Sequence, residues 1–137
     1  MTTEESSKKA RITLQKTSIL GCPVHLVTQS DAVMFCKQVI DSEETAQVVT
    51  INPEMIMQSL DNPTLANTLT EADLVIPDGI GVVWALHRKD FTHQKRVPGI
   101  ELAQAMLGIA GQKDWPVALI GSTAEVLRDT IPALEAQ

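Results

Sequence analysis

The fold is decided by the stretch VVTINPE at residues 48–54 and by the stretch LVIPDGIG at residues 74–81. Each begins with a compact run of mainly aliphatic residues, which is typical of a buried strand. After the first run, Asn52 can accept hydrogen bonds from first-turn amides, and Pro53 lacks an N–H that a helix does not need there. After the second run, the turn sequence PDG ends the strand before a further apolar segment. Both stretches therefore predict a strand that leads directly into a helix.

Strands and helices alternate on both sides of these stretches. The pattern predicts strands at residues 11–19, 24–28, 48–51, 74–76 and 117–120, and helices at about 30–40, 52–60, 61–71, 80–89, 99–110 and 124–136. This alternation indicates a Rossmann-like α/β fold, a mostly parallel sheet with helices on both faces. The turn at residues 21–23 joins the first two strands into a short N-terminal β-hairpin. Helix 80–89 is apolar nearly all round, so we expect it to be buried.

The length and composition fit one cytoplasmic domain. The chain has 137 residues, of which 44% are apolar, and this excludes wholesale disorder. Residues 1–10 are polar, so we expect a disordered lead-in followed by a single α/β domain over residues 11–137. The N-terminus lacks an apolar signal core, and no segment approaches the roughly 20 apolar residues of a membrane span. The net charge of −6 argues against general nucleic-acid binding.

Charge is unevenly distributed along the chain. Segment 87–96, HRKDFTHQKR, has a local charge of +3, which leaves −9 on the rest of the chain. A basic patch in an acidic chain points to an anionic ligand. A solvated loop between two helices explains the same charges, and charge alone favours that explanation.

Polar residues at three predicted strand ends are the site candidates, because ligands of such sheets bind outside the carboxyl ends of the strands. Asp78 lies between a buried strand and the next helix, so it fits either a general base or the N-cap of that helix. Thr50 and Asn52 flank Ile51 and so point to the same side, where they could bind a polar substrate. For Asn52 alone, a purely structural role as a helix cap is the better interpretation.

The other candidates suit an anionic group. Arg96 precedes VPG and could bind a diphosphate, although a surface arginine is equally ordinary. Gly121 and Ser122 follow the predicted strand 117–120 and could contact a phosphate or ribose, or form only a turn. Gly79 opens a partial dinucleotide-binding pattern, but Trp84 occupies its third glycine position, which argues against a nicotinamide site.

Metal and cysteine chemistry have little support in the sequence. The three histidines are scattered, without the spacing of metal ligands. Cys22 and Cys36 are best interpreted as packing residues, because neither has an obvious base beside it.

Several ordered blocks together resemble the WecG/TagA/CpsF glycosyltransferases. The blocks are GCPV at 21–24, VTINPE at 49–54, ADL at 72–74, PDGIGVVWA at 77–85, RVPGIEL at 96–102 and LIG at 119–121. The resemblance implies an inverting transferase that moves an N-acetylmannosamine-type sugar from a UDP donor to undecaprenyl-diphosphate-linked N-acetylglucosamine, in teichoic acid or cell-envelope polysaccharide synthesis. The resemblance also implies that the enzyme needs no metal cofactor. It further implies a peripheral location at the inner face of the plasma membrane.

The resemblance also implies roles for single residues. Asp78 matches the proposed catalytic base, Thr50 and Asn52 match an active-site polar pair, and Arg96 matches an active-site arginine. Family members extend well beyond residue 137, with further active-site residues and a membrane-docking appendage. We therefore expect this chain to be catalytically impaired, and the alternative function is a nucleotide-sugar binding or interaction module. An unfinished sheet edge further predicts a homo-oligomer.

Overall fold

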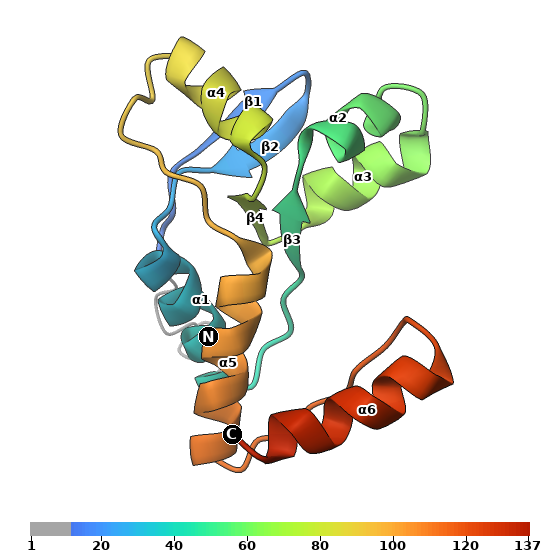
Figure 1. Ribbon diagram of the computed structural model, residues 1–137. Coiled ribbons are helices and arrows are strands. Elements are labelled where there is room, and N and C mark those ends of the chain that lie inside the picture. The colour runs from blue at the N-terminus through green and yellow to red at the C-terminus, as the bar shows by residue number, and fades with distance from the viewer. Residues whose placement is uncertain (1–11) are drawn as a thin grey trace, which may run out of the picture. The chain divides into compact units, whose positions relative to one another are not determined.

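The structure is a computed structural model that describes residues 12–137 (Figure 1). Its elements are β1 (Lys16–Ile19), β2 (Cys22–His25), α1 (Gln29–Asp41), β3 (Val48–Ile51), α2 (Pro53–Ser59), α3 (Pro63–Glu71), β4 (Leu74–Pro77), α4 (Ile80–Arg88), α5 (Gly99–Gln112) and α6 (Ala124–Glu135). The chain forms two compact units, Met1–Leu102 and Ala103–Gln137, and each is described by itself. The predicted lead-in at residues 1–10 lies outside the described residues.

Two pairs of strands organise the first unit. β1 and β2 pair antiparallel, with Lys16 opposite His25, which confirms the predicted hairpin. β3 and β4 pair in parallel, with Val48 opposite Leu74, which confirms the α/β class. Both predicted ranges need correction: β1 covers Lys16–Ile19 rather than 11–19, and β2 lies at Cys22–His25 rather than at 24–28, because the antiparallel pairing spans only these four residues of each strand.

A histidine connects the hairpin to the parallel pair. His25 is buried in β2, and its Nδ1 accepts a hydrogen bond of 2.9 Å from the backbone N–H of Val75 in β4. Burial lowers the pKa of this imidazole below its ordinary value, and nearby Lys16 lowers it further. His25 is therefore a neutral hydrogen-bond acceptor that links two sheets.

The core lies where the helices cover these strands. Figure 1 shows α2 and α3 side by side near one end of β3, with α4 next to the hairpin. The buried apolar cluster consists of Cys22, Val24, Ile51, Ile56, Leu69, Val75, Val82 and Leu86. Full burial of one such aliphatic side chain contributes about 1.5–3 kcal/mol, so this cluster fixes the ends of β3 and β4.

Side-chain caps start the helices as their sequences indicate. Asn52 Oδ1 accepts from the backbone N–H of Met55 at 2.9 Å, and Asn62 caps α3 in the same way. Helix α1 begins at Gln29, one residue before the predicted start at about residue 30, because Thr28 is the N-cap and Asp31 completes a capping box three positions later.

Two predictions about apolar segments were wrong. Residues 117–120 form no strand, and Ile120 is 97% exposed. A strand needs a partner for its backbone groups, and the four strands among residues 12–137 all pair within the first unit. Helix α4 is not buried all round either: Val82 and Leu86 are buried, whereas Ile80 and Trp84 are exposed.

Among the described residues, no helix combines the length of a membrane span with sufficient apolar character.

Candidate active site

Asp78 is held by its own backbone at the end of the parallel strand pair. The backbone N–H groups of Asp78 and Gly79 both donate to the carbonyl oxygen of Ile51, at 3.1 and 3.4 Å. Gly79, and not Asp78, is the N-cap of α4, so the alternative role of Asp78 as a helix cap was wrong. The carboxylate is therefore available for another purpose.

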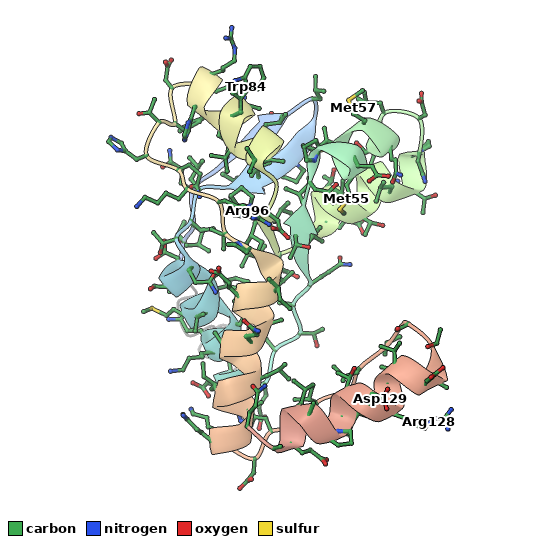
Figure 2. The ribbon with its side chains drawn as sticks, viewed as in Figure 1. Met55, Met57, Trp84, Arg96, Arg128 and Asp129 are labelled. Carbon is green, nitrogen blue, oxygen red and sulfur yellow. The ribbon has the colours of Figure 1, made fainter. Side chains whose placement is uncertain are left out.

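Arg96 binds this carboxylate. Its Nη2 lies 3.1 Å from Asp78 Oδ1, and its Nε donates to the backbone oxygen of Asp78. Figure 2 shows the Arg96 side chain beside β3 and β4. The two side chains are 50% and 25% exposed, so the pair contributes at most about 1 kcal/mol to stability. Its main effect is to orient both groups at the edge of the sheet.

The loop that carries Arg96 is anchored by neutral hydrogen bonds. Gln94 is buried, and its Nε2 donates to the backbone oxygens of Val27 and Lys95, both at 2.7 Å. The ring Nε2 of His87 lies 2.8 Å from the backbone oxygen of Gln94. Val97 is buried, and its N–H donates to the oxygen of Pro77 at 2.9 Å. The basic segment is therefore fixed against the core, and no signal in the sequence singled out Gln94.

Glycine allows α5 to begin against the site. A Cβ built on Gly99 would overlap the methyl group of Thr50 and would lie 3.3 Å from Asp78 Oδ2. Any larger residue would displace either Thr50 or the carboxylate. Gly99 is thus a spacing residue that sequence reasoning did not identify.

Gly79 has a similar role between α4 and α2. A Cβ at Gly79 would lie 2.7 Å from Pro53 Cδ, and one at Gly81 would lie 2.7 Å from Pro53 Cγ. Both distances are shorter than real Cβ contacts, so these glycines permit the close approach of the two helix starts. The predicted contact of Gly79 with substrate stays a prediction.

Thr50 and Asn52 lie near Asp78, as their alternation predicts. Thr50 contacts the start of α5, and Asn52 lies against Gly79. Asn52 also caps α2, which confirms its structural role. Because Oδ1 is used by the cap, Asn52 would meet a ligand chiefly through its amide nitrogen.

Gly121 and Ser122 belong to the second unit. They do not follow a strand, and both have positive φ, 115° and 63°, in an exposed turn. Both were chosen because they follow the predicted strand 117–120, and the described residues form no strand there. Their contact with a phosphate or ribose stays a prediction.

Space for a ligand exists beside Arg96. A cavity of about 580 Å³ lies between the segment around Thr28 and the loop that carries Phe91, Lys95 and Arg96. Within residues 12–137, no group of three His, Cys, Asp or Glu side chains is arranged to hold a metal ion. The site thus presents a carboxylate that can accept a proton and a guanidinium that can bind an anion.

Known proteins are similar to this chain in sequence. A model of the glycosyl transferase WecG/TagA/CpsF family matches residues 17–137. The chain is 32% identical to an N-acetylglucosaminyldiphosphoundecaprenol N-acetyl-beta-D-mannosaminyltransferase of Staphylococcus aureus, in an alignment that covers 98% of this chain and 52% of that protein. A protein of the same name from Bacillus spizizenii is 35% identical over 92 residues, which are 67% of this chain and 36% of that protein. The chain therefore spans about half the length of the curated relatives it matches.

Proposed function

The chain belongs to the glycosyl transferase WecG/TagA/CpsF family, and we propose on this premise that it supplies the catalytic base of an N-acetylmannosaminyltransferase. The acceptor is N-acetylglucosaminyl diphosphoundecaprenol, and the donor is the UDP-linked sugar. The names of the two relatives support the sugar and the acceptor. The observation that carries the proposal is the Asp78–Arg96 pair at the carboxyl edge of β3 and β4.

In the proposed reaction, the acceptor hydroxyl attacks the anomeric carbon of the donor sugar from the face opposite UDP. Asp78 takes the hydroxyl proton as the new carbon–oxygen bond forms. The bond from the anomeric carbon to the phosphate oxygen breaks, and its electron pair leaves on UDP. The configuration at the anomeric carbon is inverted.

Arg96 has two successive roles in this scheme. Before substrate binds, it holds Asp78 through Oδ1, while Oδ2 lies on the side of Gly99. In the reaction, its guanidinium stabilises the charge that develops on the diphosphate, for which its paired donors are suited. Thr50 and the amide nitrogen of Asn52 hold sugar hydroxyls in line for attack.

The test is acceptor-dependent UDP release from UDP-N-acetylmannosamine, with a short-lipid N-acetylglucosamine diphosphate as acceptor. We expect Asp78→Asn to abolish release, whereas Asp61→Asn, at an exposed aspartate between α2 and α3, leaves it unchanged. Measurable UDP release that is equal in the wild type and in Asp78→Asn would refute the role of Asp78. If the folded chain releases no UDP but binds the donor in calorimetry, the chain acts as a nucleotide-sugar binding module.

A further inference from the structure

The cavity of about 580 Å³ has two walls that come from distant parts of the chain. One wall lies within residues 26–31, where β2 leads into α1, and the other lies within residues 90–97, between α4 and α5. Figure 1 shows this loop as it passes the end of β2. Gln94 ties the walls together, because its Nε2 donates to the backbone oxygens of both Val27 and Lys95. The cavity is therefore formed before a ligand enters, which lowers the entropic cost of binding.

One polar atom of the first wall is left without a partner. Thr28 and Asp31 are occupied by the capping box of α1, in which Asp31 Oδ2 accepts from the N–H of Thr28 at 2.9 Å. Gln29 lies between them and also lines the cavity. Its Oε1 is buried, and within residues 12–137 it has no hydrogen-bond partner. A buried acceptor without a donor costs free energy, so a ligand that brings an N–H or O–H group to it gains affinity.

Apolar side chains line the same cavity. Leu26, Val27 and Phe91 contribute to it. Phe91 is held in place, because its N–H donates to the oxygen of Leu86 at 3.0 Å and its side chain packs against the buried core. A lone acceptor in an apolar lining suits a ligand group that has an N–H next to a methyl group. An acetamido group has both, whereas a hydroxyl group supplies a hydrogen but no apolar surface.

Arg96 connects this cavity to the candidate active site. Its side chain lines the cavity and also forms the ion pair with Asp78. In a nucleotide-linked 2-acetamido sugar, the acetamido group and the phosphate are carried by neighbouring carbon atoms. A sugar whose acetamido group meets Gln29, and whose phosphate meets Arg96, therefore presents its anomeric carbon beside the Asp78–Arg96 pair.

We propose that this cavity is the pocket that selects a donor sugar with a 2-acetamido group, and that Gln29 and Phe91 determine this specificity. Gln29 Oε1 accepts a hydrogen bond from the acetamido N–H, and the acetamido methyl group packs against the Phe91 ring. A donor with a hydroxyl group at the same carbon leaves the space beside Phe91 unfilled. The identity of the donor rests on the proposed function, whereas neither Gln29 nor Phe91 takes part in the proposed reaction.

Calorimetry with two donors tests the pocket. UDP-N-acetylmannosamine and UDP-mannose differ in the group on carbon 2, and we expect the wild type to bind the acetamido donor about tenfold more tightly. Gln29→Leu should reduce this preference by about fivefold and leave the affinity for UDP-mannose unchanged. The matched control is Gln58→Leu, at an exposed glutamine of α2, which should keep the preference. Equal affinities of the wild type for the two donors, or binding of neither by the folded chain, would overturn the proposal.

Thermal unfolding provides an independent check on Gln29. Because its Oε1 has no partner in the free protein, Gln29→Leu should unfold at the same temperature as the wild type or at a higher one. A lower melting temperature would show that the fold already uses this oxygen, and it would contradict a role in ligand selection.

Nuclear magnetic resonance of the donor tests Phe91. A methyl group that packs on an aromatic ring is shifted upfield by the ring current, so the acetamido methyl resonance should move upfield on binding to the wild type. Phe91→Leu keeps an apolar side chain against the core but removes the ring, and the shift should vanish. An upfield shift of the same size in Phe91→Leu would remove Phe91 from the pocket.

The pocket and the proposed reaction can fail separately. A preference for the acetamido donor that depends on Gln29, without UDP release, would retain the pocket and remove catalysis by this chain. UDP release without that preference would retain the transferase and remove the pocket. An affinity for the short-lipid acceptor that depends on Gln29, in place of one for the donor, would overturn the assignment to the donor sugar.

Discussion

The two units use similar aliphatic runs in opposite ways. VVTI at residues 48–51 forms β3 and pairs with LVIP of β4, and Ile51 is completely buried. VALI at residues 117–120 forms no strand, and Ile120 is almost completely exposed. Helix α6 likewise has no buried residue. An aliphatic run therefore becomes a strand only where another segment supplies backbone partners and a covering helix.

The largest expected effect comes from one isoleucine in each run. Ile51→Ala should lower the free energy of unfolding by about 2–5 kcal/mol, because it leaves a cavity in the core. Ile120→Ala should change it by less than about 0.5 kcal/mol, since an exposed side chain loses little contact. Urea unfolding followed by circular dichroism measures both. Equal effects would show that residues 117–120 are packed in solution.

The next largest change in stability is expected when two glycines of α5 are replaced by alanine. Gly99→Ala should destabilise the first unit by about 1–3 kcal/mol, because the new methyl group meets Thr50 and Asp78. Gly108→Ala is the matched control, because a Cβ there meets no described atom within 4 Å. It should stabilise the helix by about 0.5–1 kcal/mol. Thermal unfolding compares them, and a neutral Gly99→Ala would contradict the close approach of α5 to the site.

Removal of a helix N-cap in each unit is expected to have a smaller effect on stability. Asn52→Ala should cost about 1 kcal/mol, because the N–H of Met55 loses its acceptor. Thr123→Ala removes the corresponding bond to Val126 in α6. Hydrogen exchange of the β3 and β4 amides should accelerate about fivefold in Asn52→Ala. The same acceleration in Thr123→Ala would show that the two units unfold together.

The smallest effect is the pH dependence of the link between β2 and β4. The pKa of His25 is lowered by burial from 6.5, so the unfolded chain binds a proton there more readily than the folded chain. The contribution of His25 to the free energy of unfolding is fully present above about pH 6.5. This contribution is lost as the pH falls below that value, by no more than about 1.4 kcal/mol per pH unit.

His25→Gln keeps a hydrogen-bond acceptor for Val75 but removes the titration. Its unfolding free energy, measured by urea denaturation between pH 5 and 7.5, should vary less with pH than that of the wild type. The exposed His93 provides the control, and His93→Gln should retain the wild-type dependence. An unchanged profile in His25→Gln would assign the pH dependence to another group.

The sequence analysis predicted those elements whose signals are local. Asn52 and Pro53 marked the start of α2 correctly, and the run at 48–51 matched β3 residue for residue. The family resemblance was confirmed by the match over residues 17–137. The structure brings Asp78 and Arg96, both chosen from the sequence, into one ion pair, and the roles assigned to them stay predictions.

The errors concern contacts between distant segments. No local pattern indicates that residues 117–120 lack a pairing strand, or that one face of α4 is uncovered. Gln94 sits 67 positions from Val27, whose carbonyl oxygen it binds, so its anchoring role is visible only in the folded chain. Gly99 is similar, because its necessity depends on Thr50 and Asp78.

The anchoring of Arg96 by uncharged groups has a consequence for ionic strength. Gln94 and Val97 hold its loop through neutral hydrogen bonds, which dissolved salt does not screen. Salt weakens the attraction between Arg96 and Asp78 but does not release the loop. A rise in salt therefore weakens the ion pair, but the guanidinium stays in the same position. It is then free to bind another anion at that position.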